Sequence, residues 1–514
     1  MNLTKKNLLK GSITGVIQVI VNSFLIVLTI PVAIQQLGVE VYGVFILLSI
    51  VGYFGVVANL GLNASLIKHL AEQGKTRESD NDILVAFILM LSLLGLLVIM
   101  AFLLSRPLLQ SVLQIPTNLI DETTIACFRY LVVTNVFLLL GQISTAILDS
   151  LSLVHWSNGF QILYSISNRG IVLLILMLSP TLDLVGAGIL ITTSIWWFFL
   201  TYVAIKKWGG LSVVGLKVDF KRIALKHIIY GGKVYASSIL GLIFEPLNKL
   251  LIARFVNLDS VVFFDIGIKV KSLFLSILER LLYPVLPLLA SLRDNGQIKG
   301  IIEDLERLLF PFIVFCVVTI IFIAKPVAIV WIGKDIQPIA EAITFISVSY
   351  LIALIFLPLY QFFIVKGHPG KTVKLQASNV FINFIAFAIL VPYFGFRGAL
   401  IAFGLALLNS FFLSWFFQIR VLGKPGFMSF RRFISISIMA IVLILIDIII
   451  VWLHLGQWST IVLTTTLNLF LFTLLIRYFD FIHEKDIQRI LGGSNLFAAL
   501  TSRVLIKKHN RVIL

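Results

Sequence analysis

Seven basic side chains lie within stretches of this sequence that are apolar enough to be membrane helices. An arginine or lysine facing lipid at the bilayer centre costs about 3 kcal/mol, so seven of them would cost about 20 kcal/mol. We therefore expect these cations to face one another, acidic partners or a water-filled cavity inside a helical bundle. A cationic interior predicts an anionic cargo. The seven residues are Arg129, Arg169, Lys233, Lys249, Lys269, Lys271 and Arg280.

Two of these cations are spaced to lie on one helix face. Lys269 and Arg280 are eleven residues apart, about three turns of helix, whereas Lys271 points elsewhere. They would offer phosphate-binding groups at two depths, the arginine as a bidentate fork and the lysine as a point charge. The alternative is internal pairing with Asp265 and Glu279, two carboxylates that are also candidates for binding a coupling ion.

The predicted helix before it combines a carboxylate with two lysines. Lys249 follows Glu245 by four residues, so the two can pair instead of lining a cavity. Lys233 lies within about two turns of a membrane edge, where a lysine can extend its amine to the interface. Glu245, directly before Pro246 and near the middle of the membrane, is the strongest candidate for a carboxylate coupled to an ion or proton.

Arg169 stands beside a polar stripe. Asn158, Gln161, Ser165 and Asn168 share a helix whose opposite positions are apolar. The alternative for these residues is hydrogen bonding between helices, which they commonly provide in membranes. Because Arg169 is far from both ends of its helix, we expect it to be the main single contact with the cargo.

The preceding helix carries a second polar face. Asn135, Gln142, Thr145 and Asp149 recur there at helical spacing. Arg129 lies about 120° from this face and nearer the outer side of the membrane. We include Arg129 among the candidates for cargo binding.

The composition restricts the class of protein. The chain has 514 residues, of which 59% are hydrophobic and 13% charged, with a mean hydropathy of +1.05. No soluble domain could bury so much apolar surface, so we expect an all-α polytopic membrane protein. No nucleotide-binding loop, zinc pattern or Gly-x-Ser-x-Gly turn is present, and we expect no cofactor, no metal and no enzyme. The N-terminal lysines lead directly into a long helix, which predicts a retained segment.

About fourteen apolar runs are long enough to cross a bilayer, each needing about 20 residues. The charges around them are lopsided. One set of alternate loops, with both termini, holds 29 lysines and arginines, the other holds five, and seven are intramembrane. The positive-inside rule then places both termini in the cytoplasm, and it explains the net charge of +17 without nucleic acid. The runs are 11–36, 42–67, 83–104, 123–148, 153–178, 183–205, 228–254, 260–292, 308–332, 340–365, 372–394, 397–421, 432–454 and 458–478.

The two halves of the chain echo each other. Pro180 and Pro392 each precede a Gly-Ala pair by six residues, so that proline ends one helix and glycine opens the next. Two further matches, Gln142 with Gln361 and Gly11 with Gly231, have similar offsets. The offsets of 212, 219 and 220 indicate an ancestral six-helix unit, and secondary transporters often place their site between such repeats.

These patterns predict two six-helix lobes, a basic amphipathic linker between them, two additional helices and a tail. The predicted divisions are 1–205 for the N-lobe, 206–227 for the cytoplasmic linker, 228–421 for the C-lobe, 422–478 for the additional helices and 479–514 for the cytoplasmic tail.

Short motifs near the start of the chain carry a family resemblance. They are Pro31, the run Leu-Gly-Val-Glu-Val-Tyr-Gly at 37–43, Asn-Leu-Gly-Leu at 59–62 and Lys-His-Leu-Ala-Glu at 68–72. With the proline and Gly-Ala repeats, they resemble the oligosaccharide (O-unit) flippases of the multidrug/oligosaccharidyl-lipid/polysaccharide (MOP) exporter superfamily. One departure is Phe263, where the family often has tyrosine.

The resemblance implies a fold like that of the MATE exporters and a membrane transport function. The cargo would be an undecaprenyl-diphosphate-linked oligosaccharide, moved from the cytoplasmic to the outer leaflet of the bacterial inner membrane. It would serve O-antigen, lipopolysaccharide, capsule or another surface polysaccharide, with other polysaccharide-assembly membrane proteins as partners.

Two other functions compete with this interpretation. A cation-coupled multidrug exporter could use the same scaffold, but a cationic interior repels organic cations, and the first helix has no acidic residue. A membrane polysaccharide polymerase usually carries a large outer loop, whereas every outer loop predicted here is short.

Overall fold

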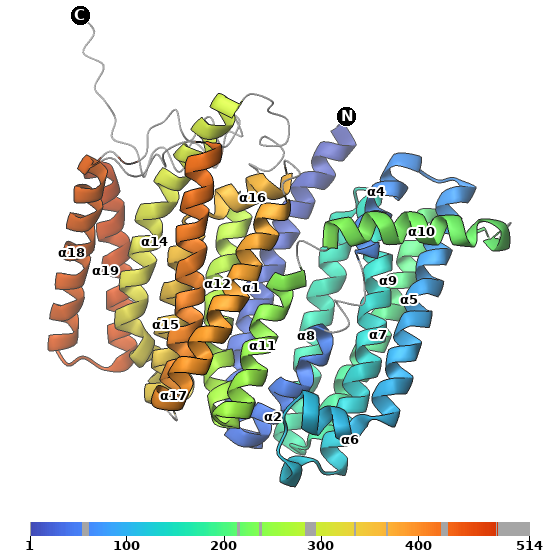
Figure 1. Ribbon diagram of the computed structural model, residues 1–514, viewed down its shortest axis with the longest axis horizontal. Coiled ribbons are helices and arrows are strands. Elements are labelled where there is room, and N and C mark those ends of the chain that lie inside the picture. The colour runs from blue at the N-terminus through green and yellow to red at the C-terminus, as the bar shows by residue number, and fades with distance from the viewer. Residues whose placement is uncertain are drawn as a thin grey trace, which may run out of the picture. The chain divides into compact units, whose positions relative to one another are not determined.

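The computed structural model describes residues 2–53, 61–212, 216–235, 239–282, 295–333, 336–365, 369–422, 430–479 and 481. Within them nearly all residues are helical and no strand is present (Figure 1). The all-α expectation is therefore confirmed. The chain forms two compact units, Met1–Val262 and Phe263–Leu514, and each is described separately.

Ten of the described helices are long and apolar enough to cross a membrane, so the protein is a multi-pass membrane protein. The expected number of fourteen spans remains a prediction. The expected span 42–67, for example, comprises helix α2 (Val39–Ser49) and helix α4 (Leu62–Gln73), and part of it lies outside the described residues. Helix α17 (Pro369–Val421) contains two expected spans, with non-helical backbone at Gly395.

The first unit is organised around α7. This helix packs against α9, α4 and α5, while α1 packs against α8. Its buried residues include Leu139, Ile143 and Ile147, which recur every four residues and form one apolar face. The helices concerned are α1 (Asn2–Leu37), α5 (Arg77–Leu103), α7 (Glu122–Ser150), α8 (Val154–Leu178) and α9 (Leu182–Trp208).

The start of α7 is fixed by its capping residue. Asp121 accepts a hydrogen bond from the backbone N–H of Thr124 at 2.8 Å, which satisfies one of the free donors of the first turn. Burial raises the pKa of the Asp121 carboxyl, but bonds from Thr124 and Thr123 outweigh it and leave the pKa below its ordinary value. Between α5 and α7 lie α6 (Ser105–Pro107), a π-helical turn (Leu108–Val112) and a 3-10 turn (Thr117–Leu119).

Helix α10 (Leu216–Tyr235) lies across the ends of α4 and α5 (Figure 1). Ile223 and Ala224 pack against Val85 of α5, whereas Leu225 and Ile229 are exposed. The expected linker is therefore an amphipathic surface helix. It also continues beyond the predicted boundary, because residues 228–235 belong to α10, and the next helix, α11, covers Ile239–Phe255.

In the second unit α14 (Asn295–Trp331) packs against α15, α18 and α19, and α15 packs against α17. Phe264 and Phe403 meet edge to face with centroids 5.2 Å apart. Gly267 of α12 lies so close to α15 that an added Cβ would be 2.8 Å from the Ala342 carbonyl oxygen. The remaining helices are α12 (Leu258–Leu282), α15 (Ile336–Leu354), α16 (Leu357–Val365), α18 (Phe430–Trp452) and α19 (Gln457–Tyr478).

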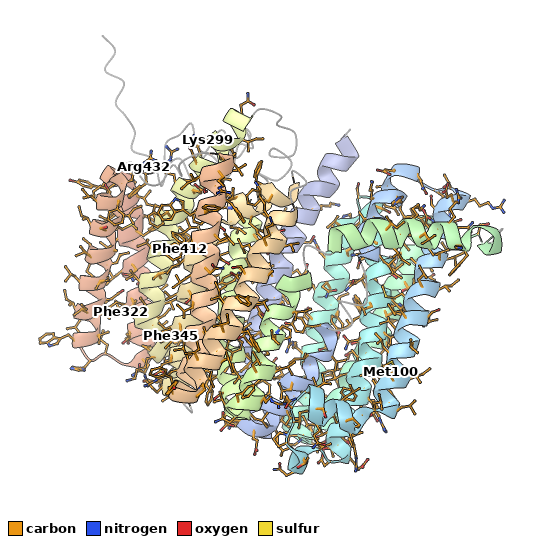
Figure 2. The ribbon with its side chains drawn as sticks, in the orientation of Figure 1. Met100, Lys299, Phe322, Phe345, Phe412 and Arg432 are labelled. Carbon is orange, nitrogen blue, oxygen red and sulfur yellow. The ribbon has the colours of Figure 1, made fainter. Side chains whose placement is uncertain are left out.

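Side chains in the second unit follow the pattern of a membrane protein. Phe345 and Phe412 are exposed along the helices, whereas Lys299 and Arg432 lie near one end of the unit (Figure 2). An exposed aromatic surface of this kind suits contact with acyl chains, and charges at the helix ends reach the aqueous interface.

The two proline and Gly-Ala repeats mark equivalent connections. Pro180 lies between α8 and α9, and Pro392 precedes the break at Gly395, whose φ is +53°. A Cβ on Gly186 would be 3.0 Å from the Cα of Cys127, and one on Gly398 would be 2.5 Å from the carbonyl oxygen of Leu390. Each glycine thus permits a close approach of two backbones.

We expect Gly61→Ala to destabilise the first unit. Gly61 precedes α4 with a φ of +74°, and a Cβ there would lie 2.3 Å from the Gly231 carbonyl oxygen of α10. The strained backbone alone should cost about 1–3 kcal/mol and lower the midpoint of thermal unfolding in detergent by several degrees. The control is Gly159→Ala, since Gly159 is helical with nothing within 4 Å of its added Cβ. Equal midpoints for the two variants would contradict the predicted close contact.

Candidate functional site

A polar pocket lies inside the first unit, between α2, α7, α8 and α9. Its volume is about 370 Å³. The expected polar face of α7 and one residue of the α8 stripe meet here, because helical spacing places the α7 residues on one side. Leu138, Leu139 and Trp196 provide apolar wall. The polar lining residues are Ser49, Tyr53, Asn135, Gln142, Thr145 and Gln161.

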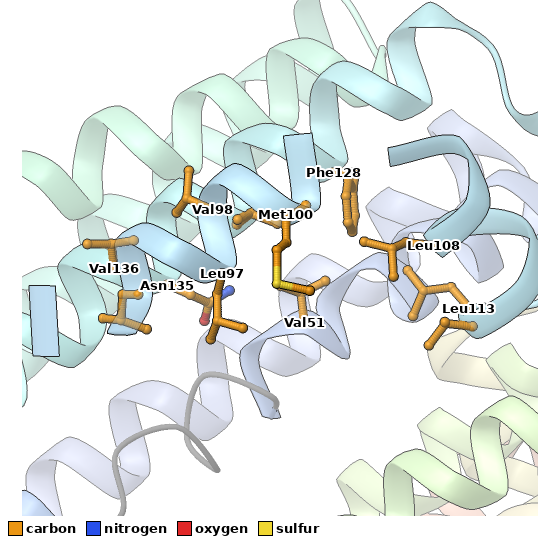
Figure 3. A pocket seen from close by; sticks show the side chains of 13 residues that line it. Val51, Leu97, Val98, Met100, Leu108, Leu113, Phe128, Asn135 and Val136 are labelled. Carbon is orange, nitrogen blue, oxygen red and sulfur yellow. The ribbon is translucent and has the colours of Figure 1, made fainter. Parts of the chain in front are cut away.

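An apolar cavity of about 390 Å³ lies between α5, α7 and the π-helical turn (Figure 3). Its wall includes Met100, Leu108 and Phe128, and its one polar lining residue is Asn135. Asn135 also lines the polar pocket, while its amide nitrogen donates to the Leu131 carbonyl at 2.8 Å. One side chain therefore borders two hollows of opposite character.

Two other residues of the α8 stripe join helices. Asn158 donates to the Gly11 carbonyl at 2.9 Å on α1, and Asn168 donates to the Thr192 hydroxyl at 3.1 Å on α9. These are the interhelical bonds that the sequence offered as an alternative. Asp149 of α7 accepts a bond from the Ser157 hydroxyl at 2.8 Å and is not among the pocket's lining residues.

Two of the predicted cargo-binding cations belong to helices that line these hollows. Arg169 is half-buried on α8, eight residues beyond Gln161. Arg129 donates from Nε to the Ser105 hydroxyl at 3.1 Å, and its guanidinium lies over the Phe102 ring at 5.3 Å. Arg129 is thus directed toward the end of α5.

The two predicted lysines of the second unit, Lys269 and Lys271, both contact other side chains of that unit. Lys269 pairs with Asp265, which is buried, and Lys271 is buried with its amine 4.2 Å from the centre of the Tyr350 ring. Such a cation–π contact offsets part of the cost of burying the charge. These contacts are compatible with the internal alternative and leave the cargo-binding role of both lysines a prediction.

For the other predicted site residues the structure gives the helix and, for some, the degree of burial. In the first unit, Lys249 is buried on α11 and Glu245 is half-buried on the same helix. The sequence analysis placed Lys233 and Lys249 on one helix. In the structure Lys233 belongs to α10 and Lys249 to α11, so that prediction is wrong. Glu279 is exposed at the end of α12. The side chains of Lys233 and Arg280 lie outside the described residues.

A buried cluster that the sequence analysis did not identify fixes α10. His227 lies between Ser65 and Asp82, with its Nδ1 2.8 Å from the Ser65 hydroxyl and its Nε2 3.4 Å from Asp82 Oδ1. Lys226 completes the cluster at 2.7 Å from Asp82 Oδ1. The side chains of Ser65, Asp82 and His227 are fully buried. Acidic residues at the start of α5, facing a basic linker, were the available signal.

A neighbouring contact holds the segment that precedes α10. Asp80 accepts bonds from the Trp208 indole N–H at 2.7 Å and the Ser212 backbone N–H at 3.1 Å. Lys75 pairs with the same carboxylate at 2.6 Å. Within the described residues no group of three or more His, Cys, Asp and Glu side chains could hold a metal ion.

Comparisons with known proteins agree with this architecture. Residues 8–292 match the family described as "Polysaccharide biosynthesis protein". A comparison with curated proteins finds no match. Because the family match spans more than half of the chain, the protein belongs to this polysaccharide biosynthesis family.

Solved structures show the same fold. "Lipid II flippase MurJ, inward closed conformation" matches with a TM-score of 0.64 and 15% identity, over 90% of this chain and 97% of that chain. A mutant of the Vibrio cholerae MATE transporter VcmN matches at 0.58 with 13% identity, over 82% and 98%. An outward-facing multidrug resistance MATE transporter of the MOP superfamily matches at 0.58 with 17% identity, over 81% and 96%. The expected MATE-like fold is confirmed.

We expect Asp82→Ala to release α10. Removing one partner of a buried ion pair typically costs about 3–5 kcal/mol, and here it also leaves His227 without its carboxylate. Hydrogen–deuterium exchange of residues 216–235 should rise by at least about tenfold, which corresponds to about 1.4 kcal/mol.

The matched control is Glu78→Gln. Glu78 is one turn earlier on α5, is 48% exposed and lies 3.7 Å from Arg222 and 3.9 Å from Lys226, so these exposed, long pairs should contribute little. Similar exchange in both variants would show that the buried cluster does not hold the helix.

Proposed function

We propose that this protein flips a polyprenyl-diphosphate-linked oligosaccharide from the cytoplasmic to the outer leaflet of the bacterial inner membrane. Access would alternate between the two sides as the predicted lobes, 1–205 and 228–421, rock about a central cavity. The product would serve a surface polysaccharide such as O-antigen or capsule. Membership of the polysaccharide biosynthesis family supports the pathway.

The polar pocket of the first unit is the observation that carries this proposal. Its lining offers amide and hydroxyl groups, which both donate and accept hydrogen bonds, beside the flat ring of Trp196. A sugar presents hydroxyl groups in return and carries no charge that would demand a counterion. The adjoining apolar cavity, reached at Asn135, would suit a hydrocarbon portion of the same molecule.

The diphosphate requires cations, and Arg169 is the foremost candidate. It is half-buried on α8, the helix that also contributes Gln161 to the pocket. An arginine can bind phosphate through two parallel hydrogen bonds, which are stronger than neutral ones. Arg129, Lys233, Lys249, Lys269, Lys271 and Arg280 remain further candidates for this cationic lining, with Glu245, Glu279 and Asp265 as candidates for ion coupling.

The chain's topology fits this direction of transport. The lopsided distribution of basic residues supports cytoplasmic termini, a cytoplasmic linker and a cytoplasmic tail. A substrate assembled in the cytoplasm would then meet the basic side of the membrane first.

We expect Arg169→Ala and Arg280→Ala each to slow flipping of a fluorescent polyprenyl-diphosphate-linked oligosaccharide in proteoliposomes. Loss of a charge-assisted hydrogen bond costs about 1.5–3 kcal/mol, which corresponds to about 10- to 100-fold in initial rate. Arg106→Ala is the control, because Arg106 is 71% exposed and pairs with exposed Glu122. Wild-type rates in both test variants would remove the proposed cargo role.

The pocket itself can be tested in the same vesicles. We expect Gln161→Leu to reduce the flipping rate about 3- to 10-fold, because it removes one amide worth about 0.5–1.5 kcal/mol per hydrogen bond. Gln110→Leu, at an exposed position of the π-helical turn, should leave the rate unchanged. If an overexpressing strain instead gains resistance to cationic drugs and the vesicles show no flipping, the exporter alternative is correct.

A further inference from the structure

A group of polar side chains is buried where α14, α18 and α19 meet in the second unit. Asp447 of α18, and Thr464 and Asn468 of α19, are fully buried, and Thr319 of α14 is 6% exposed. All three helices are long and apolar enough to cross the membrane. The pocket described above belongs to the other unit and uses none of these residues.

One amide joins the three helices. The Asn468 side-chain nitrogen donates to Asp447 Oδ2 at 2.9 Å and to the Thr319 hydroxyl at 3.1 Å. Three oxygen atoms of the group have no hydrogen-bond partner among the described residues, namely Asp447 Oδ1, Asn468 Oδ1 and the Thr464 hydroxyl. Thr464 lies one turn before Asn468 on the same buried stripe of α19.

The surroundings of this group are apolar. Leu443 and Ile450, one turn to either side of Asp447, are buried. One turn beyond Asn468, Phe472 stacks on Phe315 of α14 with ring centroids 4.8 Å apart. Within the described residues no lysine, arginine or histidine forms an ion pair with Asp447.

The carboxylate therefore cannot remain ionised and bare. Transfer of an ion of this size from water to a medium of low dielectric constant costs about 20 kcal/mol in the ideal limit and several kcal/mol after relaxation. One hydrogen bond to a charged group returns only about 1.5–3 kcal/mol. Neutralisation of Asp447 must come from a species small enough to enter a packed helix junction.

We propose that Asp447, Asn468, Thr464 and Thr319 form a binding site for a monovalent cation, either a proton or Na⁺. A proton would reside on Asp447 Oδ1, the unpartnered oxygen. Sodium would be bound by Asp447 Oδ1 together with the Thr464 and Asn468 oxygens, since hard cations prefer oxygen ligands. A single carboxylate is too few for a transition metal, in line with the absence of a metal-type cluster in the described chain.

Cation binding at this site would couple transport to an ion gradient. This coupling role rests on the proposed flipping function, whereas cation binding by Asp447 is independent of that function. Because the carboxylate is buried, uptake of a cation on one side of the membrane and release on the other requires the three-helix junction to open, as alternating access provides.

Other titratable groups on these three helices do not neutralise the carboxylate. The Cys316 thiol is buried one turn before Thr319, and an undissociated thiol carries no charge. Lys325 of α14 is on an exposed face, and Arg307, the nearest of the charged residues before Thr319 on that helix, is twelve residues away, about 18 Å along the helix. Arg477 is nine residues from Asn468, about 13 Å along α19. The remaining groups are Lys299, Glu303, Asp304 and Glu306 on α14, Arg432 near the start of α18, His454 just beyond its end, and Tyr478 at the end of α19.

The test uses the full chain in lipid nanodiscs and a hydrophobic carbodiimide, which reacts with protonated carboxyl groups. Mass spectrometry would follow labelling of Asp447 in choline buffer at constant ionic strength. For a proton site, labelling should fall at least about tenfold between pH 5.5 and pH 8.5. Once a carboxyl group is mostly deprotonated, its protonated fraction falls about tenfold for each further pH unit. For a sodium site, NaCl at fixed pH should slow labelling equally, whereas KCl should not.

Two comparisons make the result specific. Asp265, paired with Lys269, should stay unlabelled under all conditions. Thr464→Val should abolish protection by sodium and leave a proton response intact. Asp447 that stays unlabelled throughout, or that labels at a rate independent of both pH and sodium, would overturn the proposal.

A second measurement covers the case in which the carbodiimide perturbs the fold. Asp447→Asn keeps an acceptor for Asn468 and mimics the neutral acid. A proton held only by the folded chain stabilises it at low pH and is lost as pH rises, so the wild-type unfolding midpoint should fall between pH 6 and pH 9 relative to this variant. Sodium should reverse the fall if it is the occupant. Parallel pH profiles without a sodium effect contradict the site, whatever the flipping assay shows.

Discussion

A polar group inside a bilayer must find its partner within the protein, because the hydrocarbon region contains no water to supply one. This constraint accounts for most polar side chains described here. Asn158 bonds to α1, Asn168 bonds to α9, and Lys271 lies against the Tyr350 ring. Each contact both removes a penalty and joins two helices. The polar residues that do not serve packing in this way are therefore the ones that call for a functional explanation.

Two groups of such residues stand out. The first are the amides and hydroxyls of the pocket beside Asn135 and Gln161, which face a hollow large enough for part of a ligand. The second is Asp447, for which the packed junction leaves room only for something very small. One arrangement suits a bulky neutral group with many hydroxyls, and the other suits an ion. A transporter that uses an ion gradient to move a ligand needs one site for the ligand and one for the ion.

The sequence predicted those features that depend on helical periodicity. Gln142 and Thr145 share a face because they are three residues apart, and three of the four residues of the predicted face line the pocket. The fold class followed from composition and from the family motifs. By contrast, the contact of Asp82 with His227 joins residues 145 positions apart, and no local pattern announces it. The same contact makes α10 a separate surface helix, whereas apolar composition alone had assigned residues 228–235 to a membrane span.

Asp447 shows a different limit of sequence analysis. Nearly every neighbour of Asp447 on its helix is apolar, and that apolar environment is what gives a single carboxylate its significance. Only the structure pairs it with Asn468, 21 residues further along the chain, and with Thr319 on a third helix.

Helix α14 has 37 residues and so extends about 55 Å, well beyond the roughly 30 Å of a hydrocarbon core. Near its start, buried Glu306 accepts a bond from Gln418 of α17 at 2.8 Å, and further along Thr319 joins the Asp447 group. Pro311 lies between these two anchor points and removes a main-chain hydrogen bond there. The missing bond weakens α14 at this point, so a bend between the part bonded to α17 and the part packed on α18 and α19 costs less there than elsewhere in the helix.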